Sequence, residues 1–188
     1  MNQSNTINKT QRISTRDLVL TGMFTAILCV MAQIAIPIQP IPFTLSLFAL
    51  FLIGALLQPR YAFLAALVYL LLGAFGVPVF AGLKGGLAHL TGPTGGYLMA
   101  YPLMTLITAI FGQLGNKKHR IIALSSGMTI SLFLCYLIGT LWFTHITGKT
   151  LYVALTLCVF PFIPFDIVKI VLAISVSLLI RKALIKQQ

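Results

Sequence analysis

The chain has 188 residues, of which 59% are hydrophobic and only 8% are charged, and its mean hydropathy is +1.00. Soluble domains carry about 25% charged residues, so this composition excludes a soluble domain and indicates an integral membrane protein. The formal net charge of +11 comes from short basic clusters between apolar runs. Such clusters are topology signals rather than a nucleic-acid-binding face, so we expect no nucleic acid partner.

Apolar runs predict an all-α integral membrane protein, a single bundle of six transmembrane helices. In chain order the runs are Leu18–Ile36, Phe43–Leu57, Tyr61–Phe75, Tyr97–Leu114, Ile121–Phe143 and Phe165–Ile180. The second and third are 15 residues long, short of the roughly 20 that a bilayer requires. We therefore expect these two to be partly shielded or to extend into their flanking loops. The polar residues 1–17 are expected to form a cytoplasmic leader before one membrane domain at 18–188.

Basic residues set the expected orientation of this bundle. Six spans place both termini on one side, and that side carries 10 of the 13 lysines and arginines. The opposite side carries Lys84 and Lys149, and Lys169 falls within the last apolar run. Because lysines and arginines accumulate in cytoplasmic loops, we expect both termini to be cytoplasmic in a multi-pass cell-membrane protein.

Two stretches on the expected outer side are unusual. The first, Pro37–Pro42, has three prolines in six residues, which predicts an extended loop because proline disfavours helix at its own position and at the preceding one. The second, Gly76–Gly96, has seven glycines in 21 residues. Irregular backbone at a membrane must be buried in protein or line a wet cavity. Both loops are therefore candidate walls of an outward-facing pocket.

The last span begins with a charged pair. Asp166 is one of only two acidic residues in the chain, and Lys169 follows three residues later, on the same face of a helix. Pro164 fits the first turn of that helix, where its missing N–H costs nothing. An ionisable residue among hydrocarbon is costly, so the pair is a functional-site hypothesis. The alternative is a structural pair that neutralises itself.

The other reactive side chains form no recognisable set. Cys29, Cys135 and Cys158 lie singly in apolar runs, so we expect neither a disulfide framework nor a zinc site. The histidines have no partner at helical spacing, and we expect no metal. Ser125 lies about twenty residues before His145, close to a bilayer thickness along a helix, which excludes direct pairing in a hydrolase. No catalytic residue is expected.

Six motifs occur in order along the chain: Gln39-Pro40-Ile41-Pro42-Phe43-Thr44, Gln58-Pro59-Arg60, Gly76-Val77-Pro78-Val79-Phe80-Ala81-Gly82, Gly85-Gly86, Gly92-Pro93-Thr94-Gly95-Gly96-Tyr97-Leu98 and Pro164-Phe165-Asp166-Ile167-Val168-Lys169. Together they resemble the BioY family, the biotin-specific substrate-binding subunits (S components) of energy-coupling factor (ECF) transporters. The resemblance implies a six-helix bundle in a prokaryotic cell membrane that binds biotin with high affinity. It also implies a transmembrane coupling subunit and two ATPase subunits as partners.

The resemblance also implies positions for partner docking. Gly22 and Ala26 match the family's small-xxx-small motif on the first helix, usually two alanines, where the coupling subunit docks. Small residues at this spacing let another helix approach closely, and glycine at the first position keeps the surface small. No complete nucleotide-binding motif occurs, because Phe143 stands where Gly148-Lys149-Thr150 would need an upstream glycine. We therefore expect no enzyme activity in this chain, and ATP hydrolysis only in the partner subunits.

Biotin offers ureido N–H donors, a ureido carbonyl and a carboxylate on an apolar body. We expect Asp166 to accept from the ureido N–H groups, with Lys169 orienting it or donating to a ligand oxygen. The other expected ligand contacts come from the outer loops and the adjoining helix starts: Gln39, Phe43, Phe80, Gly82, Lys84 and Tyr97. Lys84 occupies a variable position in the family's glycine loop and receives no specific role. No cofactor is expected besides the transported ligand.

Two other functions compete with this hypothesis. A stand-alone proton-coupled vitamin carrier would use Asp166 as its proton site. Against it, the first half of the chain has no second charged, proline-broken helix of the kind an inverted repeat would supply. A purely structural membrane subunit would bind no ligand, and the two elaborate outer loops argue against that function.

Overall fold

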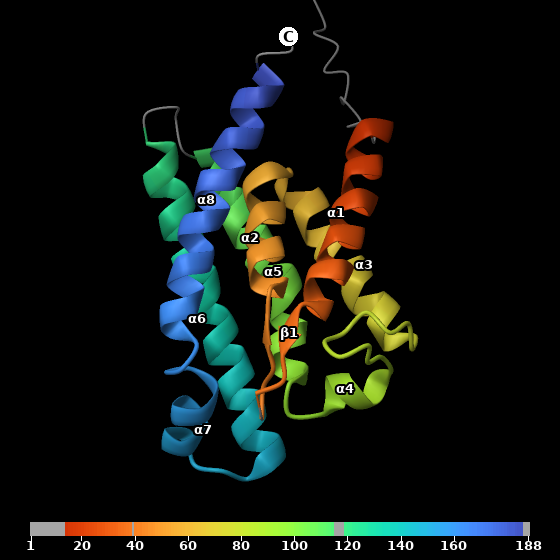
Figure 1. Ribbon diagram of the computed structural model, residues 1–188, viewed down its shortest axis with the longest axis vertical. Helices are drawn as coiled ribbons and strands as arrows, with labels where there is room; N and C mark the ends of the chain where they lie inside the picture. The colour runs from red at the N-terminus through yellow and green to blue at the C-terminus, as the bar shows by residue number, and fades with distance from the viewer. Residues whose placement is uncertain (1–13, 39, 115–118, 186–188) are drawn as a thin grey trace, which may run out of the picture.

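The computed structural model of the protein describes residues 14–38, 40–114 and 119–185. Within these ranges four helices are long and apolar enough to cross a membrane: α1 (Thr15–Gln33), α5 (Gly95–Leu114), α6 (Arg120–Thr147) and α8 (Ile163–Ile185). Two apolar helices are shorter, α2 (Ser46–Leu56) and α3 (Pro59–Ala74). All of these run up and down the long axis of the bundle, and the start of α1 and the end of α8 lie at the same end (Figure 1).

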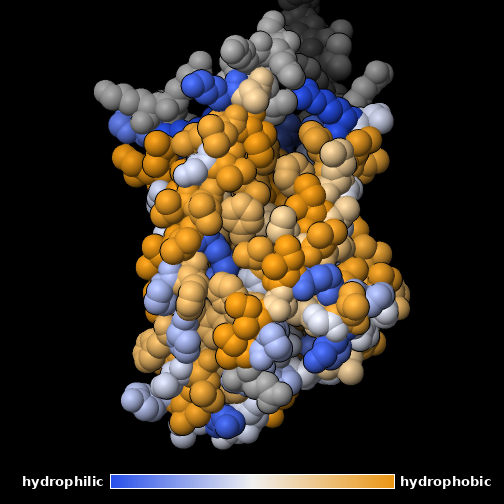
Figure 2. Space-filling view, in the orientation of Figure 1, coloured by the Kyte–Doolittle hydropathy of each residue, from blue (hydrophilic) through white to orange (hydrophobic). Residues whose placement is uncertain are grey.

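The opposite end of the bundle carries the short elements. Strands β1 (Ala35–Ile36) and β2 (Phe43–Thr44) pair antiparallel, with Ala35 opposite Thr44. Helices α4 (Leu87–Thr91) and α7 (Leu151–Cys158) lie at the same end (Figure 1). On the face that Figure 2 shows, apolar residues cover most of the middle of the molecule, and hydrophilic residues gather at the end where α1 begins and in smaller patches toward the opposite end. The fold is therefore mostly helical and has the surface of a multi-pass membrane protein.

The first two expected spans were wrong at three boundaries. Helix α1 begins at Thr15, earlier than the expected Leu18, and ends at Gln33, so Ile34–Ile36 is not helical. Phe43 lies in β2, and α2 begins only at Ser46. The prolines of the intervening loop disfavour helix in their neighbourhood, and the freed backbone pairs across the hairpin instead.

Helix α2 occupies the centre of the bundle. All residues from Ala49 to Ala55 are buried, and the helix packs against α1, α5 and α8. A helix that is apolar on every side must lie in a protein core or in lipid, and here the neighbouring helices bury it. The short second apolar run is therefore shielded by the neighbouring helices, and it does not extend into its flanking loops.

Candidate functional site

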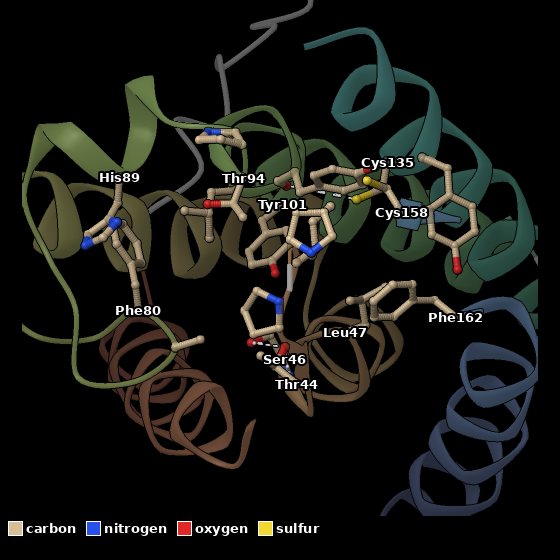
Figure 3. A pocket seen from close by; sticks show the side chains of 18 of the residues that line it. Thr44, Ser46, Leu47, Phe80, His89, Thr94, Tyr101, Cys135, Cys158 and Phe162 are labelled. Atoms are coloured by element: carbon tan, nitrogen blue, oxygen red, sulfur yellow. Dashed lines mark hydrogen bonds between the residues drawn. The ribbon is translucent and has the colours of Figure 1, made fainter. Parts of the chain in front are cut away.

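A cavity of about 280 Å³ lies at the end of the bundle that carries the short elements. Its walls come from the hairpin after α1, the glycine-rich segment around α4, and the adjoining parts of α2, α3, α5, α6, α7 and α8. The polar and aromatic residues that line it are Thr44, Ser46, Tyr69, Phe80, Lys84, His89, Tyr97, Tyr101, Tyr136, Phe162, Asp166 and Lys169. Figure 3 shows Phe80 and His89 together on one side, with Phe162 on the other.

An ion pair lies in the wall formed by the first turns of α8. Helix α8 begins at Ile163, so Pro164 occupies its first turn as the sequence predicted. Asp166 and Lys169 therefore share one helix face, and Lys169 Nζ lies 2.8 Å from Asp166 Oδ1. The two residues are only 2% and 4% exposed. A buried pair of this kind must be well hydrogen-bonded to offset the loss of hydration.

Two aromatic residues complete the surroundings of this pair. The hydroxyl of Tyr136, from α6, donates a hydrogen bond to Asp166 Oδ2. The ring of Phe43, from β2, lies 4.0 Å from Lys169 Nζ, measured to the ring centroid, which is a cation–π contact. Thus each carboxylate oxygen holds one donor, and each can accept another. Lys169 has three N–H donors and gives one to Asp166, so the pair keeps both accepting and donating capacity for a ligand.

Phe80 stands in an aromatic wall on the other side of the cavity. Its ring meets Tyr69 edge-on, with centroids 5.6 Å apart, and His89 edge-on at 6.5 Å. Tyr69 also stacks with Tyr101, with centroids 6.2 Å apart. The Phe80 ring lies directly against the backbone of Gly73 in α3, where any Cβ would overlap it. The absence of a side chain at Gly73 therefore lets the Phe80 ring pack directly against α3.

Gln33, the last residue of α1, fastens the glycine-rich segment to the bundle. Its Nε2 donates to the carbonyl oxygens of Val79 (3.0 Å) and Phe80 (3.2 Å), and its Oε1 accepts from the N–H of Leu83 (2.9 Å). The segment between these contacts turns sharply, because Phe80 and Lys84 pair antiparallel and Leu83 has a φ of 55°. A single side chain thus positions the loop that presents Phe80 and Lys84 to the cavity.

Tyr97 forms another part of the wall. Its hydroxyl shares a hydrogen bond of 3.2 Å with Thr140 in α6, and its ring packs on the backbone of Gly139. One turn from these residues, Trp142 donates from Nε1 to the carbonyl oxygen of Gly92 (2.9 Å), next to cavity-lining residues 93 and 94. These contacts tie the start of α5 to α6 and fix Tyr97 at the cavity.

The structure brings most of the expected site residues to one place. The cavity is lined by Asp166, Lys169, Phe80, Lys84 and Tyr97. Two others lie beside it rather than in its wall: Phe43 contacts Lys169, and Gly82 lies in the sharp turn with a φ of 73°. Gln39 lies outside the described residues. The roles of these residues toward a ligand stay predictions.

Some residues at this site were not predicted from the sequence. Tyr136 bonds Asp166 from 30 residues away, and no local pattern marks it. Gln33 gave a usable signal, as the only glutamine in the first apolar run. His89 lines the cavity although its sequence context suggested nothing. No group of three or more metal-binding side chains occurs within the described ranges.

Membrane-length helices enclosing an end cavity with a buried ion pair define a multi-pass membrane protein built around a small-molecule site. The BioY family profile matches residues 3–186, nearly the whole chain. The chain belongs to the BioY family.

Relatives and a solved structure agree with this assignment. The probable biotin transporter BioY of Pyrococcus horikoshii is 41% identical over 162 residues, covering 86% of this chain and 94% of that protein. The biotin transporter BioY of Thermotoga maritima is 38% identical over 170 residues, covering 89% and 96%. The crystallised S-component for biotin from an ECF-type ABC transporter has a similar fold, with a TM-score of 0.80 and 24% identity over 89% of this chain and 91% of that chain. The family is one of transporters, not enzymes.

Proposed function

We propose that the chain is the biotin-binding membrane subunit of an ECF-type vitamin uptake transporter. It captures biotin with high affinity from the outer side of a prokaryotic cell membrane and delivers it through an ATP-driven partner module. The membrane domain, residues 18–188, then crosses the bilayer six times, with α2 and α3 as the shorter spans. Both termini, including the leader at 1–17, face the cytoplasm, and the cavity faces outward.

The buried ion pair carries this proposal. Asp166 and Lys169 line a cavity within an apolar bundle, and each keeps hydrogen-bonding capacity that the described residues do not use. A carboxylate that can accept suits the ureido N–H groups of biotin, and an ammonium that can donate suits a ligand oxygen. Since the two charges of the pair cancel, the pair suits binding of a small polar molecule rather than ion conduction, which uses rings of like charges.

The remaining walls suit the apolar part of the ligand. The cavity volume of about 280 Å³ lies just below the roughly 300–1,000 Å³ typical of small-molecule sites, which suits a small ligand. Phe80, Tyr97 and Phe162 offer aromatic surface to the bicyclic ring and chain. Gln39, Gly82 and Phe43 are expected to complete the enclosure.

Docking to the coupling subunit is assigned to the outward face of α1. Gly22 and Ala26 are exposed there, and a Cβ at Gly22 would meet no atom within 4 Å. Large apolar side chains flank them, including Val19 and Met23, which are 57% and 56% exposed. Small residues between exposed apolar ones let a second helix pack closely against this face.

Equilibrium titration of the detergent-purified chain with biotin tests the proposal. Trp142 lies next to the cavity wall, so its fluorescence should report the ligand. We expect stoichiometric, nanomolar binding without nucleotide. No binding at micromolar biotin by demonstrably folded protein would contradict the ligand assignment.

Asp166→Asn should weaken biotin binding at least tenfold, which corresponds to about 1.4 kcal/mol. Asp17→Asn is the matched control, because Asp17 is the only other acidic residue and lies in the first turn of α1, at the opposite end of the bundle. Uptake by the chain alone that stops when the proton gradient is dissipated would instead favour the stand-alone carrier.

A further inference from the structure

A second cavity, of about 180 Å³, lies at the end of the bundle where α1 begins and α8 ends. It is formed where α2 ends, around residues 54–58, beside the last turns of α5 at Ala109, Gly112 and Gln113. Arg120, the first residue of α6, and Arg181, near the end of α8, complete its wall. Two guanidinium groups therefore line one small cavity.

Each arginine makes one helix-capping contact. Arg181 Nη2 donates to the carbonyl oxygen of Ala55 in the last turn of α2, and Arg120 Nη2 donates to that of Gly112 in the last turn of α5, at 3.4 Å. The carbonyl end of a helix is partly negative, so these contacts are favourable. They account for one of the five N–H donors on each guanidinium.

The other donors are left with too few acceptors. The Nε atoms of Arg120 and Arg181 are buried and have no hydrogen-bond partner among the described residues. No acidic side chain neutralises them there: the chain has only Asp17 and Asp166, and the ion pair found within the described ranges joins Asp166 to Lys169. Buried donors without acceptors cost free energy, and two like charges in one half-buried cavity repel, so an anion bound there would be stabilising.

We propose that this cavity binds a phosphate group, supplied by the headgroup of an anionic membrane lipid. The planar guanidinium fork matches phosphate oxygens, and two forks in one cavity provide the charge. Basic pockets between membrane helices at the cytoplasmic surface are suited to anionic headgroups. Leu114, Ile121 and Ile122 beside the site are 72%, 55% and 68% exposed, so they offer apolar surface for acyl chains. Free phosphate shares the headgroup's chemistry and serves as a second probe.

The test is thermal unfolding of the delipidated full chain in a non-ionic detergent. Phosphatidylglycerol is compared with phosphatidylcholine at equal mole fraction, and inorganic phosphate with chloride at equal ionic strength. At about ten times its Kd, a bound lipid should raise Tm by about 3–6 °C. We expect this rise with phosphatidylglycerol and not with phosphatidylcholine. A comparable rise with inorganic phosphate would show that the site takes the free ion as well.

Variants locate the effect. Arg120→Gln combined with Arg181→Gln should abolish the rise, whereas Arg60→Gln should retain it. The Arg60→Gln substitution also removes a positive charge from this end of the bundle. Arg60 itself is exposed and lies over the ring of Tyr61 instead of lining the cavity. If the double variant does not fold, Arg181→Lys keeps the charge without the planar fork and should lose at least half of the rise. Equal effects of the two lipids on the unmodified chain, or a full rise in the folded double variant, would overturn the proposal.

Discussion

Replacing Lys169 with methionine removes the positive charge beside Asp166 and keeps a long, unbranched side chain. In the structure Lys169 Nζ lies 2.8 Å from Asp166 Oδ1, and both side chains are at most 5% exposed. The variant leaves a buried carboxylate with the Tyr136 hydroxyl as its one donor within the described residues. It also removes the cation–π contact with Phe43. Breaking a buried ion pair by removing one partner costs about 3–5 kcal/mol.

This cost should be visible in the absence of ligand. For a chain of this size, 1 kcal/mol corresponds to about 2–4 °C in Tm, so we expect Lys169→Met to lower Tm by about 6–20 °C. Thermal unfolding of the detergent-purified chain, followed by Trp142 fluorescence, measures the shift. The biotin titration of the same preparation, at a temperature well below its Tm, measures binding separately.

A double variant separates stability from ligand binding. Adding Asp166→Asn to Lys169→Met removes the unpaired charge and keeps an acceptor for Tyr136, so at least half of the lost Tm should return. Biotin binding should stay at least tenfold weaker than in the unmodified chain, because the carboxylate and the ammonium are both gone. Wild-type affinity in the double variant would show that the pair is only structural. An unchanged Tm in Lys169→Met would refute the buried-pair reasoning itself.

Three further changes test other parts of the site and the docking face. Gly73→Ala should displace Phe80, whose ring it would overlap, and weaken biotin binding about tenfold in the titration, even though alanine favours a helix. Gln33→Leu removes the hydrogen bonds that hold the loop at Phe80 and Leu83, so stopped-flow measurements should show faster biotin dissociation with unchanged helix content by circular dichroism. Gly22→Leu should reduce uptake by the assembled transporter and leave biotin binding by the isolated chain unchanged, with Gly22→Ala as the smaller control.

Each of these has an outcome that would contradict it. Undiminished affinity in Gly73→Ala would mean that Phe80 is not part of the binding wall. Unchanged dissociation in Gln33→Leu would mean that the glycine-rich loop does not control ligand exit. Loss of biotin binding in Gly22→Leu would mean that the outer face of α1 acts on the pocket and not only on a partner.

The helices were predictable because their signals are local. Apolar length and flanking basic residues mark a membrane helix, and Tyr97–Leu114 corresponds closely to α5, Gly95–Leu114. The hairpin was not predictable from the same signals, since pairing of Ala35 with Thr44 depends on where the chain returns after the prolines. The central position of α2 likewise depends on how α1, α5 and α8 pack around it.

The same distinction applies to the site. Asp166 and Lys169 are three residues apart on one helix, so their contact follows from helix geometry alone. Tyr136 and Gln33 act on partners 30 and about 50 residues away, and only tertiary packing brings them there. In the sequence, the arginines of the second cavity indicate only orientation, and the burial of their Nε atoms is visible only in the fold.

The neutrality of the Asp166–Lys169 pair has an electrical consequence. Carrying one elementary charge across a potential of 100 mV involves about 2.3 kcal/mol of work. Because the two charges lie on the same turns of α8 and sum to zero, any movement of that segment through the membrane field carries both together. The pair itself therefore does no net work against the membrane voltage. In a transport cycle that uses this pocket, the voltage would act on the charge of the ligand and of Lys84, which also lines the cavity, and not on the pair.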